Sequence, residues 1–381
     1  MTTSIVHFYR HSPPPPPAVG AELTGCDAGM PVAPISLYAL APEIFDGVLN
    51  PDVLGILLTS KCSIACRHCC NESAPGHEST RSYAESEQLL AAARAIDTLK
   101  EIGISGGEPF MYVPLLRSVV RLAVRYGYTV SVTTNGFWAR SPVAAARLMA
   151  MLRSDGLAAL HISTSAFHRE FLDACILPQA VRAAVDAGLR PTINVVASRG
   201  HGLAEVREAL GPLADAVDYV VMPCLPAGRA EHSIDNTEFV QEQQSPHGDC
   251  REDFRKLALD QQGDLYPCCS PGGFTAPLRL GNIHAARPGE APNGLLRLLS
   301  ILHEVGPGYF LPFVRAAYPQ DLALARFSDK CHLCHVLLSD DRYTAVVHWA
   351  GERLFRSLET GRDPPQDQPL DKGGHIATNT T

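Results

Sequence analysis

The first half of the chain alternates between short apolar runs and longer amphipathic stretches. Val53–Thr59 is a nearly continuous apolar run, as expected for a strand that is buried on both faces. The amphipathic stretch after it carries apolar residues at helical spacing, namely Leu89, Ala93, Ile96 and Leu99. Further strands are predicted at Ile102–Ser105, Tyr128–Thr133, Leu157–Ser163, Pro191–Val196 and Ala216–Met222. Six strand–helix units in succession predict an α/β fold with a parallel sheet and right-handed crossovers.

Local start and stop signals support the helices between these strands. Ser141 followed by Pro142 is a good helix start, because serine caps the first amide groups and proline fits the first turn. Helices are also predicted at Pro178–Ala187, with Gly188 as the stop, and at Leu203–Leu213. Six strands are fewer than the eight that close a barrel.

The second half reads differently. Leu257–Tyr266 predicts a hairpin, with Gly263 as the turn residue that needs a positive φ. Tyr343–Leu358 predicts a helix, and the partly hydrophobic segment Gly306–Asp329 is either packed or a lid over a substrate. The predicted organisation is an N-terminal extension (1–50), a core (51–235), a second domain (245–340), a C-terminal helix (341–360) and a tail (361–381). Because of the polyproline run Pro13–Pro17 and the charged, Pro- and Gly-rich tail, we expect the extension to be partly disordered and the tail to be disordered.

Composition excludes several classes of protein. The net charge is −8, from 32 basic and 40 acidic residues, which argues against a nucleic-acid-binding surface. No apolar run approaches the roughly 18 residues of a membrane span. The 12 cysteines are clustered in a long chain whose first residues show no secretory signal, so a disulfide framework is a poor interpretation and a reducing cytoplasm is expected.

Three cysteines in an eight-residue run carry the most information. Cys62, Cys66 and Cys69 have the spacing C-x3-C-x2-C directly after the first strand, where parallel α/β enzymes keep their chemistry. Iron–sulfur clusters are normally held by four cysteines, so three thiolates on one loop suggest a cubane with one open iron. A zinc site is the alternative, with His68 or Cys70 as a fourth ligand, although both are adjacent to Cys69.

A second motif follows the second strand. In the run Gly106, Gly107, Glu108 and Pro109, the glycines allow backbone to approach a ligand closely, and the carboxylate can accept from an ammonium group. Taken alone, the run is better explained as an ordinary strand-to-helix turn with Pro109 at its entry. Because it lies about forty residues after the cysteine motif, we favour the ligand-binding interpretation. Thr134, Asn135 and Gly136 end the third strand, where an Asn-Gly turn is a fair competitor.

A second cysteine set lies downstream. Cys250 and Cys268 flank the predicted hairpin, which would bring them to one end, and Cys331 and Cys334 are two residues apart. Together these four thiols could form a closed cage for a metal cluster. A structural zinc ion with four cysteine ligands is the alternative.

These motifs together resemble the radical S-adenosylmethionine (SAM) superfamily over about residues 53–340. The resemblance implies an open (β/α)6 barrel followed by a small twitch-type (SPASM-like) hairpin and helix domain. It implies that Cys62, Cys66 and Cys69 hold a [4Fe–4S] cluster whose open iron binds SAM, which is cleaved reductively to a 5′-deoxyadenosyl radical. It also implies one auxiliary [4Fe–4S] cluster on Cys250, Cys268, Cys331 and Cys334.

The resemblance also implies residues that bind SAM. The glycine-rich run is matched to its amino group and the imidazole of His68 to its adenine. The remaining candidates are Thr134, Asn135, Ser163 and Asn194, of which Asn194 is equally well explained as a hydrogen-bonded core residue. The family aspartate two residues after Ser163 is Ser165 here, so an acidic role at that position is in doubt.

The function implied is abstraction of a substrate hydrogen atom, in the modification of a ribosomal peptide or in the oxidation of a small alcohol or amino sugar. Cys224, after the sixth strand, is a candidate hydrogen-atom donor, although a buried structural cysteine is the commoner case. Arg229 is a candidate for binding a substrate carboxylate or alkoxide, although such an arginine more often packs at a domain junction. Expected partners are a reductase or flavodoxin-type electron donor and, for a peptide substrate, a separate peptide-recognition protein. A non-catalytic zinc or iron–sulfur scaffold or sensor is the alternative of another class.

Overall fold

The computed structural model describes residues 42–240, 247–284, 294–322 and 326–361. Within them, nine strands form one sheet in the order β6-β5-β4-β3-β2-β1-β7-β8-β9. The six predicted strands are present, each within about two residues of its predicted bounds. They are β1 (Val53–Thr59), β2 (Glu101–Gly106), β3 (Thr129–Thr134), β4 (Ala159–Thr164), β5 (Thr192–Ala197) and β6 (Asp218–Pro223).

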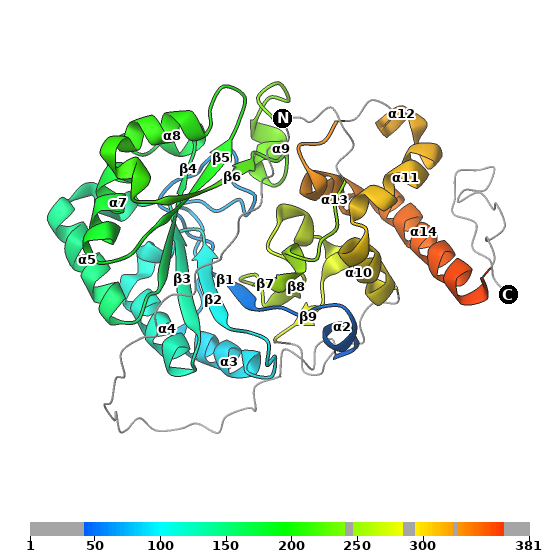
Figure 1. Ribbon diagram of the computed structural model, residues 1–381, viewed down its shortest axis with the longest axis horizontal. Coiled ribbons are helices and arrows are strands. Elements are labelled where there is room, and N and C mark those ends of the chain that lie inside the picture. Colours follow the sequence, from blue (N-terminus) through cyan, green and yellow to red (C-terminus); the bar gives the residue numbers. More distant parts are fainter. Residues whose placement is uncertain (1–41, 241–246, 285–293, 323–325, 362–381) are drawn as a thin grey trace.

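All six strands run parallel, as βαβ units require. Strands β2, β4 and β5 alternate buried with half-buried residues, whereas the last four residues of β1 are all buried. Leu54, Ile102 and Val130 are fully buried in the main core. Figure 1 shows α3, α4, α5, α7 and α8 as an arc outside the curved strands. The sheet therefore forms the open partial barrel expected of this fold class.

Helix α5 begins where its start signal predicts, whereas α7 begins at Ile176, two residues before the predicted Pro178. Ser141 accepts from the amide of Ala144 and caps α5, and Ser82 forms a capping box with Glu85 before α3. Two helices are shorter than predicted: α3 ends at Ala93, so Ile96 and Leu99 lie in turns, and α8 ends at Leu210, where a 3-10 turn takes over. The helix bounds are α3 (Tyr83–Ala93), α4 (Val113–Arg125), α5 (Pro142–Ser154), α6 (Ala166–Arg169), α7 (Ile176–Asp186), α8 (Leu203–Leu210) and α9 (Arg229–Ser233).

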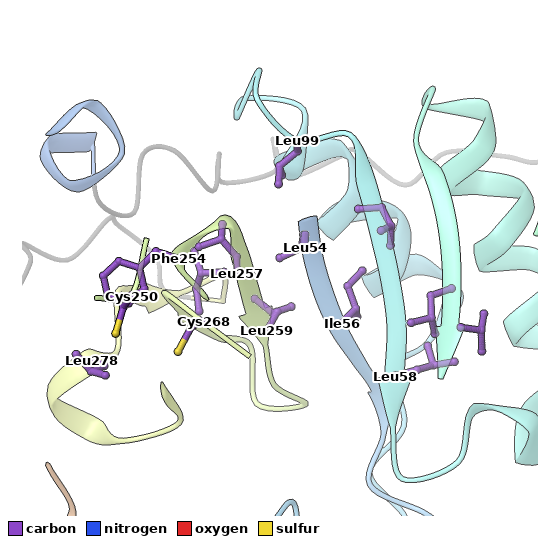
Figure 2. Close-up of a cluster of buried hydrophobic side chains, with 14 of the residues drawn as sticks. Leu54, Ile56, Leu58, Leu99, Cys250, Phe254, Leu257, Leu259, Cys268 and Leu278 are labelled. Atoms are coloured by element: carbon purple, nitrogen blue, oxygen red, sulfur yellow. The ribbon is translucent and has the colours of Figure 1, made fainter. Parts of the chain in front are cut away.

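The predicted hairpin exists and continues the same sheet. Strand β7 (Lys256–Leu259) pairs parallel with β1, and β8 (Asp264–Tyr266) folds back antiparallel through a turn in which Gly263 has φ +87°. The short β9 (Gly281–Asn282) adds to its far side. Figure 2 shows Leu257 and Leu259 of the hairpin facing Leu54 and Ile56 of β1. The first and second halves of the chain therefore share a core.

Helices α10 (Leu295–Glu304), α11 (Leu311–Ala317), α12 (Pro319–Leu322), α13 (Lys330–Ser339) and α14 (Asp341–Thr360) complete the second half. In the segment predicted to pack or to form a lid, Phe310, Leu311 and Val314 are at most 2 % exposed, so these residues belong to the core. In the predicted extension, α2 (Pro42–Gly47) buries Ile44. The polyproline run and residues 362–381 lie outside the described residues, and no helix in the described part is long and apolar enough to span a membrane.

Candidate functional site

The loop that carries Cys62, Cys66 and Cys69 leaves the carboxyl end of β1 and closes on itself. The amide of Cys62 donates to the carbonyl of Ala74 at 3.2 Å, and the amide of Cys69 donates to the carbonyl of Cys66 at 3.2 Å. Cys62 and Cys66 are buried and Cys69 is half-buried. Residues 62–74 form the segment that we call the cysteine loop.

The glycine pair after β2 holds the start of this loop. The amide of Gly107 donates to the carbonyl of Thr59 at 2.6 Å, and the amide of Glu108 donates to the carbonyl of Lys61 at 2.8 Å. A Cβ added to Gly106 would lie 2.4 Å from the carbonyl oxygen of Thr59, and one added to Gly107 would lie 2.2 Å from that of Lys61. No side chain fits at either position, because the end of β2 packs directly against the backbone at the end of β1.

Glu108 braces the same edge of the sheet. Its carboxylate is fully buried and accepts from the hydroxyl of Thr134 at 2.8 Å, the amide of Asn135 at 2.7 Å and the amide of Phe110 at 3.1 Å. Burial raises the pKa of Glu108 to about 7, although these three hydrogen bonds oppose the shift. The side chain therefore ties the end of β2 to the end of β3, and its contact with an ammonium group stays a prediction.

Asn135 reaches from the end of β3 to the cysteine loop. Its side-chain nitrogen lies 3.6 Å from Sγ of Cys62 and donates to the hydroxyl of Ser63 at 3.2 Å. Its side-chain oxygen accepts from the amide of Phe137. An N–H directed at a cysteine sulfur stabilises the thiolate form, which is the form that binds metal.

His68 lies in a small aromatic group. Its ring stacks on Phe167 with centroids 5.1 Å apart and meets His168 edge-on at 4.8 Å. Ligand atoms of Cys66, His68 and His168 all lie within 4.8 Å of one another, and Nδ1 of His68 is buried without a hydrogen-bond partner among the described residues. Burial lowers the pKa of His68 to about 4, so the imidazole is neutral. The zinc alternative therefore keeps a possible donor set, with His168 as a member that sequence reasoning missed.

A hollow that opens to solvent lies beside these rings, at the carboxyl ends of β3, β4 and β5. Asn135 and Ser163, two of the predicted SAM-binding residues, line it. Charged or titratable groups at its wall are His168, Arg169, Asp173, His201 and Glu205. Asn194 is half-buried and pairs in register with Ser163. The roles of both in SAM binding stay predictions.

The four downstream cysteines converge. Figure 2 shows the sulfur atoms of Cys250 and Cys268 on the same side of the hairpin. Burial is the main cause that raises the pKa of each of the four thiols, and the charges of Cys331 and Cys334 add to the rise at Cys268. Helix α13 supplies Cys331 and Cys334 and is capped by Asp329, whose carboxylate accepts from the amide of His332 at 2.8 Å.

Two glycines that sequence reasoning missed make room for this group. A Cβ on Gly273 would lie 2.4 Å from Sγ of Cys268, and one on Gly272 would lie 3.1 Å from Cβ of Cys334 and 2.6 Å from the carbonyl oxygen of Cys331. The run Ser270-Pro271-Gly272-Gly273 directly after two cysteines is the signal that could have found them. The backbone here approaches thiols more closely than any other residue type allows.

Cys224 and Arg229 lie on the segment after β6. Cys224 is 1 % exposed and belongs to the same apolar cluster as Cys62, Cys66 and Phe167. Burial raises the pKa of Cys224 to about 12, so its sulfur is protonated at neutral pH. Arg229 donates to carbonyl groups of the cysteine loop, and its contact with a substrate stays a prediction.

Comparison with known proteins identifies the core. Residues 56–213 match the sequence profile of the Radical SAM superfamily. Residues 56–213 therefore form a radical SAM core. The chain is 24 % identical over 273 residues to the Bacillus subtilis protein named "Putative peptide biosynthesis protein YydG", an alignment that covers 69 % of this chain and 83 % of that protein.

Two further similarities are more limited. The GTP 3′,8-cyclase of Moorella thermoacetica is 29 % identical over 165 residues, which is 40 % of this chain and about half (49 %) of the cyclase. The crystal structure of Streptococcus suis SuiB bound to its precursor peptide SuiA aligns over 80 % of this chain and 75 % of that one, at 14 % identity and a TM-score of 0.38.

The radical SAM family implies a [4Fe–4S] cluster and SAM as cofactors, and the residues present fit them. Soft thiolates are the ligands that iron–sulfur clusters require, and the loop supplies three. Burial raises the pKa of Cys62 to about 11, so a bound metal is what would hold this sulfur as a thiolate. The N–H of Asn135 directed at the same sulfur supports that form.

Proposed function

We propose that this radical SAM enzyme modifies a ribosomally made peptide by removing a hydrogen atom from one of its residues. The sequence relationship to a protein named for peptide biosynthesis supports the substrate class, because it extends over both halves of the chain. When bound, the cluster and SAM would supply the radical that abstracts the hydrogen atom. Cys62, Cys66 and Cys69 would hold that cluster, and Cys250, Cys268, Cys331 and Cys334 would hold an auxiliary one.

The observation that carries the type of modification is the position of Cys224. Cys224 belongs to neither predicted ligand set, and it is buried in the same cluster of side chains as Cys62 and Cys66. Its amide donates to the carbonyl of Ala197 at 2.7 Å, which fixes the main chain at the end of β5. Because burial raises the pKa of Cys224 to about 12, it keeps its hydrogen at neutral pH. We therefore favour epimerisation, in which Cys224 gives its hydrogen atom to the opposite face of the substrate carbon radical. The thiyl radical left on Cys224 would return to the thiol with one electron from the expected flavodoxin-type donor and one proton from solvent.

The first experiment measures 5′-deoxyadenosine from anaerobically reconstituted protein with SAM and dithionite, beside the Cys66→Ala variant. Nucleoside from the wild type alone supports the radical-generating site. Zinc in place of iron in the same preparation would favour the scaffold alternative instead.

The second experiment tests the substrate and Cys224. A candidate precursor peptide is incubated in D2O, and deuterium at its α-carbons is measured by mass spectrometry. The wild type is expected to incorporate deuterium, whereas Cys224→Ala should form nucleoside without incorporation. Cys175→Ala, which removes an exposed thiol outside both ligand sets, is the matched control. Incorporation by the Cys224→Ala variant at the wild-type level would refute the role of this thiol.

A further inference from the structure

Arg229 is joined to the cysteine loop by four hydrogen bonds. Its amide donates to the carbonyl of Cys69 at 3.1 Å, and Nη1 donates to the carbonyl of Cys66 at 2.8 Å. Nη2 donates to the carbonyls of Glu72 and of Ser73, the latter at 2.9 Å. One side chain from the segment after β6 thus contacts the main chain of two predicted cluster ligands and of the turn that follows them.

The turn that Arg229 holds is strained. Glu72 has φ +53°, the only positive φ of a non-glycine residue in the described part of the chain. A non-glycine residue in this region is disfavoured and persists only where the surroundings impose it. Nη2 of Arg229 donates to the carbonyls of both Glu72 and Ser73, so it holds two successive peptide groups at this turn.

The residue before Arg229 is shaped for the same contact. Gly228 has φ +59°, and a Cβ at this position would lie 2.4 Å from the carbonyl oxygen of Cys70. The main chain of the two segments therefore touches directly, which fixes where the guanidinium enters. Helix α9 begins at Arg229, so the contact is anchored at the start of a regular element.

A second arginine of the loop shows what Arg229 does differently. Arg67 forms ion pairs with Glu170 at 2.9 Å and Glu238 at 3.5 Å, so its charge is balanced by carboxylates. The guanidinium of Arg229 donates to neutral carbonyl groups, and its charge remains beside the cysteines. A positive charge near an iron–sulfur cluster favours the reduced form, since reduction adds an electron.

We infer that Arg229 is a positioning residue that fixes the cysteine loop around the SAM-binding cluster and raises the reduction potential of that cluster. The inference rests on the proposed assignment of Cys62, Cys66 and Cys69 as its ligands. It gives Arg229 a role different from the substrate contact predicted from the sequence. Arg229 acts through the loop and takes no part in the reaction itself.

The test compares the full-length variants Arg229→Gln and Arg229→Lys with the wild type after anaerobic reconstitution. Iron per chain and the EPR signal are measured with and without SAM, and the midpoint potential is taken from an EPR-monitored titration. For Arg229→Gln we expect about 10- to 100-fold weaker cluster retention, as for other residues that orient metal ligands, and a more negative potential in the cluster that remains. Arg229→Lys keeps the charge but not the forked contacts, so it should restore the potential and only part of the retention.

Arg190→Gln is the matched control, since it removes the same charge from an exposed ion pair with Asp218 at the opposite end of β6. Retention and potential of Arg229→Gln equal to those of the control would overturn the inference. If Arg229→Gln loses all iron and its fold, the Arg229→Lys variant decides. Wild-type cluster retention in Arg229→Lys would refute the inference that the forked guanidinium contacts hold the loop, and reduced retention in a folded Arg229→Lys protein would support it. A wild-type protein whose EPR signal does not respond to SAM would instead contradict the proposed function.

Discussion

Replacing Gly273 by alanine tests the four-thiol site directly. The added Cβ would lie 2.4 Å from Sγ of Cys268 and 2.8 Å from the carbonyl oxygen of that residue. Non-bonded heavy atoms rest at about 3.5–4.0 Å, so the sulfur or the loop would have to move by about 1 Å. Gly273 does not have the left-handed backbone that alanine avoids, so the substitution acts through this contact alone.

The magnitude follows from the kind of contact. Extra volume in a packed site costs about 1–3 kcal/mol. Because the displaced atom is itself a predicted ligand, we expect binding at this site to weaken by about 10- to 100-fold, the range seen when the support of a metal ligand is lost. The other cluster should be unaffected, since its ligands lie on a different loop.

The assay places Gly273→Ala in a background that lacks Cys62, Cys66 and Cys69, so that iron reports on the four-thiol site. Iron and acid-labile sulfide per chain are measured after anaerobic reconstitution. Gly76→Ala is the matched control, because no atom lies within 4 Å of its added Cβ and its φ is not left-handed. If the Gly273→Ala protein binds as much iron and sulfide as the background protein without this substitution, the role assigned to Gly273 at the four-thiol site is refuted.

Two further predictions concern the same two regions. Asp329→Ala removes the cap of α13, the helix that carries Cys331 and Cys334, and should lower the free energy of unfolding by about 1 kcal/mol and reduce the iron bound in the same background. Asp329→Asn can still cap the helix, so it should keep both the stability and the iron. Equal melting temperatures of the wild type and the two variants would contradict this prediction. Burial raises the pKa of Glu108 from an ordinary value of 4.5 to about 7, so the folded protein binds this proton more tightly than the unfolded chain does. The contribution of Glu108 to stability therefore falls as the pH rises from about 4.5 to about 7, by about 3 kcal/mol in all. Urea unfolding at about pH 5 and about pH 8 should show this fall in the wild type but not in Glu108→Gln, and an identical pH dependence of the two proteins would refute it.

The sequence predicted the strands well because their signal is local. Buried parallel strands are short and apolar, and Val53–Thr59 coincides with β1 to the residue. Helix ends were less well predicted, as at Ala93, where the apolar spacing continues through Ile96 and Leu99 although the helix has stopped. Buried residues in turns keep the same spacing as helical ones, so the pattern alone cannot separate them.

The site was predictable where a motif is contiguous and not where the fold brings residues together. The spacing of Cys62, Cys66 and Cys69 is visible in one loop, whereas His168 reaches His68 only because β4 ends beside the loop. The same holds for Arg229, which lies 163 residues from Cys66 in sequence and yet donates to its carbonyl. Every residue has a main-chain carbonyl, so the sequence of the loop does not indicate which carbonyls a distant arginine contacts.

The pairing of β7 with β1 has a consequence for the two thiol sites. The strand that leads into the cysteine loop is hydrogen-bonded in register to the strand that begins the hairpin, from Val53 opposite Lys256 to Ile56 opposite Leu259. The hairpin turn adds a second link, because Gln261 donates to the carbonyl of Thr59 at 3.1 Å. The separation of the two sites is therefore set by one sheet and not by a linker. A substitution that loosens this ladder should disturb both sites together, whereas one at Gly273 or Arg229 should disturb a single site.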